Sequence, residues 1–381
     1  MDKYFYGIWV ASVVNLDFPS EKGLPADKLR AELDDIVATA EKAGQNAVLF
    51  QVRPASDALY KSKIFPVSEY LTGKQGSPLP DGFDPLAYMV DKCHAKGMEL
   101  HAWLNPYRIT LGSAENPSQD ISALCPNHPA RLHPEYVVAY PDGKLYYNPA
   151  LQEVRDLVAE GIREIVEGYA VDGIHFDDYF YPYPMFVEDN GVKTEAEYDD
   201  KKEFDEYKAG GGTMTRGDWR RENVNKLIKQ CYDVIHEIRD GCSFGVSPFA
   251  IWRNKSEDCP EGMATNGLEC YGALYADCVA WVEGGYIDYI CPQIYWTFED
   301  ARAPFGVILD WYNAFMEGKK AKLYAGHGLY RCEQEGWAQD EIPKQIDYCK
   351  AAKNCAGSVF FDYKRLKKNP FGVTERIAER K

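Results

Sequence analysis

The chain has 381 residues, with 43 Lys and Arg against 59 Asp and Glu and a formal net charge of -16. This charge repels phosphate backbones and anionic lipid surfaces, which argues against nucleic acid as a partner. No stretch approaches the roughly 18 apolar residues of a membrane helix, so we expect no membrane span.

The beginning of the chain, "MDKYFYGIWV", lacks the basic, apolar and small-residue regions of a signal peptide. The 11 Cys residues are scattered and never paired as C-x-x-C, so the sequence predicts neither a zinc site nor a disulfide framework. We expect most of them to be buried thiols, which suits a reducing compartment. If the chain is complete, a cytoplasmic location is expected.

Strand-like apolar runs alternate with helix-like amphipathic runs along the whole chain. The eight expected strands begin at residues 4, 46, 98, 171, 243, 287, 322 and 357. Helical patterns lie near residues 26–43, 84–96, 151–168, 216–239, 271–283, 303–317 and 340–353. Eight such units predict a closed (β/α)8 TIM barrel rather than an open sheet, in a single domain over residues 1–381.

The connections differ at the two ends of the predicted barrel. The helix-to-strand joints are short and carry glycine where a helix C-cap favours it, at Gly44, Gly97, Gly241, Gly285 and Gly318. The strand-to-helix connections are long, and they span residues 54–83, 106–150, 180–215 and 253–270. Because barrel enzymes build their sites on that face, the sequence predicts a walled cleft there.

Polar residues stand near strand ends that a barrel filled for stability alone would give to Val, Ile and Leu. Side chains alternate across a strand, so one parity of each strand faces the barrel axis. If the apolar parity faces the helices, the inward residues are Gln51, Arg53, His101, Trp103, Asn105, His175, Asp177, Gln293, Tyr295 and Asp362. Together they predict a polar pocket at one mouth of the barrel.

The stretch "DGIHFDDYFYP", residues 172–182, reads as a buried strand that ends in two adjacent carboxylates, Asp177 and Asp178. Two such groups cannot both ionise cheaply at a partly desolvated site, so we expect one raised pKa and one low pKa. This arrangement would hold a general acid beside a charged partner. A structural alternative stays open, in which Asp177 binds Arg53 or His175 and Asp178 caps the following loop.

The sequence resembles glycoside-hydrolase-like family 10 in segments that run from the first strand to the last. These are "YGIWVAS", "FQVRP", "FDPLAYMVDKCHAKGMELHAWLNPYR", "YNPALQEVRDLVAEGIREIVEGYAVDGIHFDDYFYP" and "YICPQIYW". The resemblance implies a barrel that acts on bacterial cell-surface glycans, including peptidoglycan strands stripped of stem peptides, with relatives that are usually exported. The strand end also looks like the adjacent-aspartate site of substrate-assisted N-acetylhexosaminidases. It looks more loosely like the chitinase signature, in which the acid would fall on Tyr179.

The residues and the resemblance together predict a glycosidase that acts through Asp177 and Asp178. In a substrate-assisted scheme the acetamido oxygen of the sugar attacks the anomeric carbon, Asp177 holds the acetamido N–H, and Asp178 protonates the leaving oxygen. In an ordinary retaining scheme Asp177 is the nucleophile and another loop supplies the acid, with Asp362 as a candidate. Both schemes stay open.

The expected partner is an oligosaccharide or polysaccharide. Substrate-binding residues are expected to be Arg53, His101, Asn105, Tyr107, His175, Tyr179, Trp252, Gln293, Tyr295, Trp296 and Asp362. The aromatic residues expected on rim loops, either stacking on sugar rings or filling loop cores, are Tyr107, Tyr147, Phe180, Trp252 and Trp296.

We expect neither a cofactor nor a bound metal. Two other classes of protein remain open. One is a non-catalytic glycan-binding barrel, which would keep the aromatic rim and need no raised carboxylate pKa. The other is a metal-dependent hydrolase, in which the converging ligands would be His101, His175, His327, Asp177 and Asp362.

Overall fold

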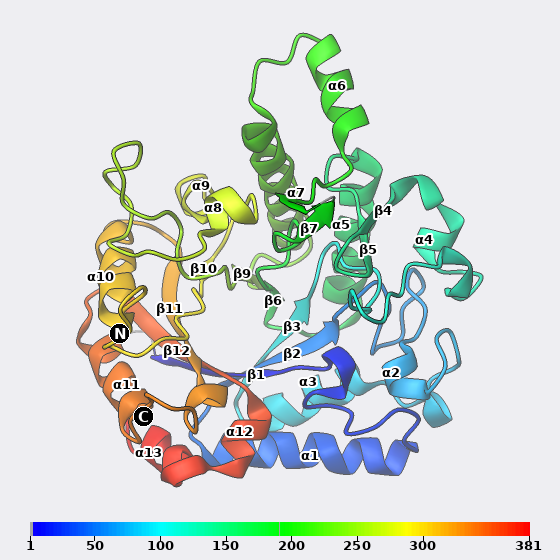
Figure 1. The fold of residues 1–381 in the computed structure, drawn as a ribbon. Coiled ribbons are helices and arrows are strands. Elements are labelled where there is room, and N and C mark those ends of the chain that lie inside the picture. Colours follow the sequence, from blue (N-terminus) through cyan, green and yellow to red (C-terminus); the bar gives the residue numbers. More distant parts are fainter. Residues whose placement is uncertain (1–2, 190) are drawn as a thin grey trace.

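The computed structural model describes residues 3–189 and 191–381 (Figure 1). Eight parallel strands close into a barrel, and each pairs with the barrel strands before and after it in the chain. They are β1 (Phe5–Val10), β2 (Ala47–Arg53), β3 (Glu99–Leu104), β6 (Gly173–Phe176), β9 (Ser243–Val246), β10 (Tyr289–Ile290), β11 (Lys322–Gly328) and β12 (Cys355–Phe361). The predicted (β/α)8 barrel is confirmed.

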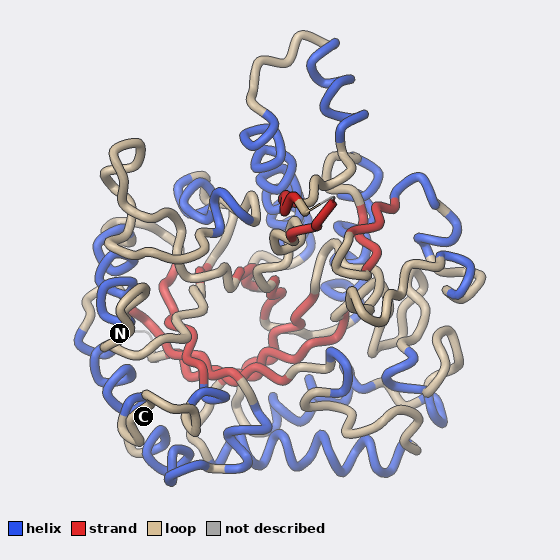
Figure 2. Tube along the Cα trace, in the orientation of Figure 1, coloured by secondary structure: helices blue, strands red, loops and turns tan. Residues whose placement is uncertain are grey.

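Helices surround the strands as an outer layer (Figure 2). They are α1 (Ala26–Lys42), α3 (Pro85–Ala95), α5 (Gln152–Gly168), α7 (Arg216–Ile238), α9 (Cys278–Glu283), α10 (Phe305–Phe315) and α11 (Glu341–Ala351), followed by α12 (Tyr363–Lys368) and α13 (Val373–Ala378). The start of α3 shows how the sequence sets a boundary, since the Asp84 side chain accepts from the N–H groups of Leu86 and Ala87 and Pro85 takes the first helical position. The helical pattern expected over residues 271–283 is split between a short α8 (Cys270–Ala273) and α9.

Four of the five predicted C-cap glycines adopt the left-handed conformation that favours glycine, with φ values of 71° at Gly44, 66° at Gly97, 66° at Gly285 and 72° at Gly318. Gly241 does not, so that prediction is wrong. The reason is that α7 ends at Ile238, and Arg239 is already extended with φ -151° and ψ 99°, so the chain leaves the helix before it reaches Gly241.

Long excursions on the carboxyl-terminal face contain short elements of their own. A hairpin of β4 (Val137–Tyr140) and β5 (Lys144–Tyr147) lies in the excursion after β3, and a hairpin of β7 (Phe186–Asp189) and β8 (Val192–Glu195) in the one after β6. Short helices complete the set: α2 (Glu69–Thr72), α4 (Pro129–Leu132) and α6 (Lys201–Ala209). Figure 1 shows α6 standing out from the barrel beyond α7.

The barrel interior is filled by aromatic and imidazole rings rather than by aliphatic layers. Tyr289 lies between His101 and His175, and its hydroxyl is 2.9 Å from the Nδ1 atom of each. The neighbouring strand β9 carries glycine beside this ring, because a Cβ atom on Gly245 would lie 1.9 Å from the Tyr289 ring. This packed layer forms the support beneath the carboxyl-terminal face.

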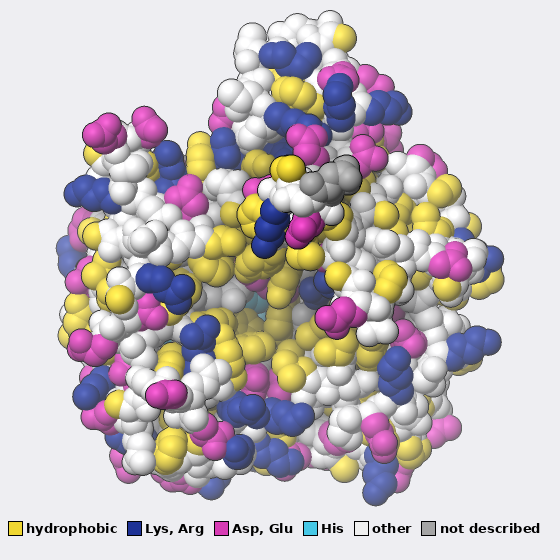
Figure 3. Space-filling model, viewed as in Figure 1, with side chains coloured by type: hydrophobic (Ala, Val, Ile, Leu, Met, Phe, Trp, Pro, Cys, Tyr) yellow, Lys and Arg dark blue, Asp and Glu magenta, His cyan; other side chains and the backbone are white. Residues whose placement is uncertain are grey.

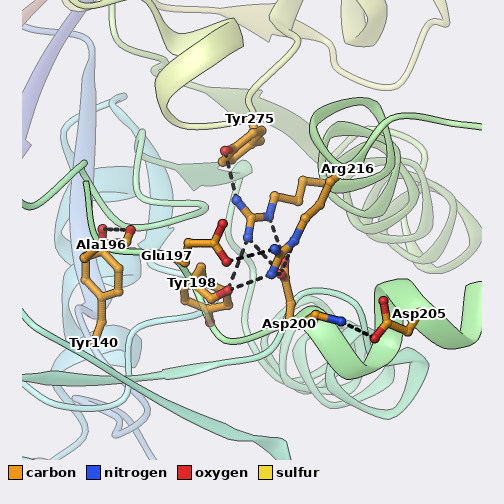
Figure 4. A network of polar contacts seen from close by, with 10 residues as sticks. Tyr140, Ala196, Glu197, Tyr198, Asp200, Asp205, Arg216 and Tyr275 are labelled. Atoms are coloured by element: carbon orange, nitrogen blue, oxygen red, sulfur yellow. Dashed lines mark hydrogen bonds and ion pairs between the residues drawn. The ribbon is translucent and has the colours of Figure 1, made fainter. Parts of the chain in front are cut away.

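A buried ion cluster anchors the excursion that follows β6 to α7 (Figure 4). Asp200 has no exposed side-chain surface, and it accepts from Arg220 Nε at 2.7 Å and from Arg216 Nη2 at 2.6 Å. Both guanidinium groups also donate to the Tyr198 carbonyl, and Arg220 reaches the hydroxyl of Tyr275 at 2.9 Å. Through these contacts, the base of the excursion is attached to α7 and to the loop after β9.

Within residues 3–189 and 191–381, no helix combines the length and the apolar character that crossing a membrane requires.

Replacing Asp200 with Asn should lower the free energy of unfolding by about 3 kcal/mol, because two arginines then lose the buried carboxylate that compensates them. Asp205→Asn is the matched control, since Asp205 pairs with Lys201 in the same excursion and their side chains are 59% and 68% exposed. The control should cost less than about 1 kcal/mol. Urea unfolding of both variants measures the difference, and equal losses would contradict the anchoring role of Asp200.

Candidate active site

A cavity of about 350 Å³ opens at the carboxyl ends of the barrel strands. Figure 3 shows this face hollowed near its centre, with hydrophobic side chains gathered around the hollow. Six of the predicted catalytic and substrate-binding residues line it: Asp177, Asp178, Tyr179, Gln293, Tyr295 and Trp296. The expected pocket at the barrel mouth therefore exists.

Asp177 is buried and held by hydrogen-bond donors from the neighbouring strand. Its Oδ2 accepts from Trp103 Nε1 at 3.1 Å, and its Oδ1 accepts from Asn105 Nδ2 at 3.1 Å. The Asn105 amide cannot turn round without loss, because its Oδ1 already accepts from the Arg108 N–H at 3.0 Å. Both oxygens of Asp177 are thus placed as acceptors, which suits the charged form.

Asp178 is equally buried but has partners of another kind. Its Oδ2 meets the hydroxyl of Tyr183, and its Oδ1 accepts from Gln293 Nε2 at 3.0 Å. A tyrosine hydroxyl can donate to a carboxylate or accept from a protonated carboxyl, so this site tolerates both forms of Asp178.

Burial raises the pKa of both carboxyls. The pKa of Asp177 rises to about 7, because desolvation and the neighbouring Asp178 outweigh the nearby charge of Arg108 and the hydrogen bond from Trp103. Burial also raises the pKa of Asp178, against the hydrogen bonds from Tyr183 and Gln293. The expectation of one raised and one low pKa is wrong, because both carboxyls are buried and desolvation raises the pKa of each.

Three predicted residues lie beneath the cavity instead of lining it. Asn105 supports Asp177, while His175 accepts from Trp9 Nε1 at 3.1 Å and lies 3.0 Å from the Ser247 hydroxyl. His101 lies deeper still, because its Nε2 is 3.2 Å from Glu99 at the start of β3. Strand parity gave their direction correctly but not their depth along the barrel axis.

Arg53 and Asp362 face away from the barrel axis, so the predictions for both are wrong. The pairing of β2 with β3 shifts register between Gln51 and Arg53, which turns the Arg53 side chain outward. A Cβ atom on Gly161 of α5 would lie 2.2 Å from Arg53 Nη1, and the Arg53 guanidinium covers the Phe65 ring, 4.3 Å from its centroid. Asp362 caps α12 by accepting from the Arg365 N–H at 2.9 Å.

An aromatic residue that faces the barrel axis next to Asp362 explains why the predicted direction of the Asp362 side chain is wrong. Phe361 lines the cavity, so an aromatic residue occupies the inward position that the apolar rule assigned to the helix side. The assumption that the apolar side of a strand faces the helices fails wherever the barrel interior is itself apolar.

Four of the five expected rim aromatics fill loop or helix cores. Tyr107 is fully buried, Phe180 packs on Trp281 at 5.2 Å, and the Tyr147 hydroxyl bonds Ser56 at 2.6 Å. Trp252 donates to Asp277 at 3.1 Å and stacks on Trp311 in the helix layer. Trp296 alone of the five lines the cavity.

The cavity also contains residues that the predicted site left out. They are Trp9, Val13, Gln51, Trp103, Arg108, Tyr183, Ser247, Phe249, Tyr330, Arg331 and Phe361. Strand parity predicted that Gln51 and Trp103 face the barrel axis, although they were not named as substrate-binding residues, and it could have added Trp9 in the same way. The side chains on excursions, such as Tyr183 and Arg331, carry no periodic signal and could not be found this way.

The residues proposed as metal ligands do not converge. His327 faces the helices, with Nδ1 3.0 Å from Gln345 and Nε2 3.0 Å from the Ser358 hydroxyl, while Asp362 caps a helix. Across the described ranges, no group of three or more His, Cys, Asp or Glu side chains could hold a metal ion.

An eight-stranded parallel barrel with buried carboxylates at its carboxyl-terminal mouth is the architecture of the TIM-barrel glycosidases. The family model described as glycosyl hydrolase-like 10 matches residues 5–341. The chain belongs to this family, as the resemblance predicted, and it is a glycoside hydrolase.

Curated relatives extend over nearly the whole chain. The glycosyl hydrolase YngK of Bacillus subtilis (strain 168) is 38% identical over 383 residues, which covers 99% of this chain and 71% of YngK. The glycosyl hydrolase DigH of Escherichia coli (strain K12) is 34% identical over 374 residues, which covers 93% of this chain and 82% of DigH.

Solved structures share the fold at low identity. The glycoside hydrolase domain of PgaB (BpsB) from Bordetella bronchiseptica has a TM-score of 0.60 at 11% identity, covering 98% of both chains. The catalytic domain of β-amylase from Paenibacillus polymyxa has a TM-score of 0.58 at 12% identity, and the match covers 99% of this chain and 97% of the β-amylase chain.

The raised pKa of Asp177 predicts a pH-dependent cost to stability. The pKa of an aspartate in the unfolded chain is about 3.9. Between that pH and about 7 the folded chain therefore binds more protons than the unfolded chain. Stability from this group is therefore lost as pH rises. The free energy of unfolding should fall relative to the Asp177→Asn variant, by up to about 1.4 kcal/mol per pH unit.

Urea unfolding of both proteins between about pH 5 and pH 8 measures this difference. Asp205→Asn, which removes an exposed carboxylate, is the control. A free energy of unfolding of the wild type that stays constant or rises with pH, relative to that of Asp177→Asn, would contradict the assignment.

Proposed function

We propose that this glycoside hydrolase cleaves N-acetylhexosamine-containing glycans of the bacterial cell surface, such as peptidoglycan strands, by a substrate-assisted mechanism. One observation carries the mechanism. Among the residues that line the cavity, the acidic ones are Asp177 and Asp178, adjacent in sequence at the end of a single strand. The substrate class follows from the family resemblance.

Ordinary glycosidases need two carboxyl groups on either side of the scissile bond, about 5 to 9.5 Å apart. Asp177 and Asp178 both leave the same strand end, and the cavity wall facing them contributes aromatic and amide groups, among them Tyr295, Phe361 and Trp9. Asp362, the candidate acid of the retaining scheme, is engaged as a helix cap outside the cavity. A nucleophile supplied by the acetamido group of the sugar removes the need for a second carboxyl.

The hydrogen-bond partners favour different roles for the two carboxyls. Asp177, with both oxygens accepting from Trp103 and Asn105, suits the charged group that accepts the acetamido N–H. Asp178, beside the hydroxyl of Tyr183, suits the protonated group that acts as general acid. The two carboxyls are adjacent and buried, so the pair titrates as a unit, and the raised pKa of about 7 at Asp177 reflects this pair. The active form holds one proton, which we assign to Asp178 from the hydrogen-bond partners.

In the first step the acetamido oxygen forms a bond to the anomeric carbon while the glycosidic C–O bond breaks. The leaving oxygen takes the proton of Asp178, and Asp177 orients the acetamido N–H and balances the charge that develops on the ring formed. In the second step Asp178 removes a proton from water, whose oxygen attacks the anomeric carbon and reopens that ring. The product keeps the original anomeric configuration.

The Asp177→Asn and Asp178→Asn variants keep shape and remove charge, and each should lower kcat by about 10² or more. The double variant should cost little beyond the worse single variant, since the two groups act in one step. Asp178→Asn should also lose the basic limb of the pH profile. Steady-state kinetics on chitin oligomers and denuded peptidoglycan, with products sized by mass spectrometry, test this.

A substrate whose acetamido groups are replaced by free amines is the matched chemical control, because it cannot supply the attacking oxygen. Equal turnover of the acetylated and deacetylated oligomers would contradict substrate assistance. Near-normal turnover by both single variants would contradict the catalytic roles altogether.

Trp296 should contribute to sugar binding, because it lines the cavity and contacts Phe249 at 5.6 Å in an edge-to-face arrangement. Replacing Trp296 with Ala should raise KM about tenfold with a smaller change in kcat. Trp252→Ala is the matched control, which should lower stability by about 3 to 5 kcal/mol and leave the KM of the folded enzyme unchanged. A similar rise in KM for both variants would show that the effect is not one of stacking.

A further inference from the structure

Four charged side chains line the active-site cavity: Asp177, Asp178, Arg108 and Arg331. The two acids are explained by the proposed chemistry. The two arginines stand out because they place positive charge in the cavity of a chain whose net charge is -16.

Arg108 has partners within the protein. Its Nε donates to the Pro54 carbonyl at 2.9 Å, and its guanidinium lies over the Tyr179 ring at 4.7 Å. Its charge also lowers the pKa of Asp177. Arg108 therefore serves as the electrostatic partner of Asp177.

Unlike Arg108, Arg331 has no acidic partner. Its Nε donates to the Tyr330 hydroxyl at 3.0 Å, and its guanidinium lies over the same ring, 5.4 Å from the centroid. No carboxylate oxygen of the described residues lies within ion-pair distance of this guanidinium. The nearby acid in sequence, Glu333, is already paired with Lys368 at 2.6 Å. The Nη1 and Nη2 groups remain as an unused pair of donors held in a fixed plane.

The position of Arg331 fits contact with a sugar next to the cleaved bond. It follows β11, which is three strands away from β6 around the barrel, so it faces the carboxyl pair across the mouth. The wall beneath it is aromatic, since Tyr330 meets Tyr295 at 5.7 Å and Phe361 at 5.9 Å, both edge to face. A sugar ring lying on this wall would bring its substituents to the guanidinium.

We propose that Arg331 is a specificity-determining residue, which binds through Nη1 and Nη2 a carboxylate carried by a sugar adjacent to the scissile bond. This inference rests on the proposed function and narrows its substrate to carboxylated N-acetylhexosamine glycans. A guanidinium fork matches a carboxylate in a bidentate arrangement, which a neutral hydroxyl cannot reproduce.

The charge balance of the cavity supports an anionic ligand. When the carboxyl pair holds one proton, the lining carries an excess of one positive charge, and a single carboxylate on the substrate neutralises it. A second anion would have no cation to meet, so the site distinguishes a singly charged sugar unit from a more highly charged one.

The test measures binding by calorimetry in the Asp178→Asn background, which separates binding from cleavage. The ligands are an N-acetylhexosamine oligosaccharide that carries a carboxyalkyl ether, the same oligosaccharide with that group as a primary amide, and an unsubstituted chitin oligomer. A further pair of ligands is an oligosaccharide with a uronic acid unit and the amide of that unit. This pair distinguishes a carboxylate on the sugar ring itself from one on an ether substituent.

With Arg331 present, the carboxylate ligand should bind at least about tenfold more tightly than its amide. Arg331→Gln should abolish that preference and leave the binding of the amide within about twofold. Arg331→Lys, which keeps the charge but loses the fork, should retain only part of the preference. Arg302→Gln is the matched control, since Arg302 is an exposed arginine on the rim loop after β10 and lies outside the cavity lining.

Equal binding of carboxylate and amide, or an equal loss for both in Arg331→Gln, would overturn the inference while leaving the proposed function intact. Failure of every N-acetylhexosamine ligand to bind, the chitin oligomer included, would overturn the proposed substrate class and this inference together.

Discussion

The burial of two adjacent carboxyls at the end of β6 is the constraint on which the rest of the site depends. Removing them from water is costly, so each must meet hydrogen-bond donors that are already in place. Those donors come from separate parts of the chain: Trp103 and Asn105 from β3 and its end, Tyr183 from the excursion after β6, and Gln293 from the end of β10. Closure of the barrel is what brings them within reach.

The layer beneath the pair keeps this arrangement rigid. Trp9 donates to His175, whose other nitrogen can then donate to Tyr289, and the Tyr289 hydroxyl continues the chain to His101. The rings fit because the neighbouring strand carries glycine at the paired position, and a Cβ atom on Gly173 would lie 2.4 Å from the His101 ring. A polar column with every member satisfied gives the floor of the cavity a single arrangement.

The walls of the cavity depend on excursions rather than on strands. Tyr183 lies in the excursion whose base is anchored by Asp200, and Arg331 follows β11 on the opposite side of the mouth. The barrel thus fixes the acids, while the excursions supply side chains to the cavity walls around them.

The sequence by itself determined the barrel, because eight alternating strand and helix patterns are local features, and it located Asp177 and Asp178 because a buried apolar strand ending in paired acids is visible in the chain. It did not determine how deep each inward side chain lies along the barrel axis, or whether every side chain points to the axis or to the helices. His101 lies too deep in the barrel to line the cavity, and Arg53 turns outward at a register shift. Phe361 takes the inward position that was expected for Asp362. Only the tertiary structure decided these points, because strand register and the paths of excursions are set by packing between segments far apart in the sequence.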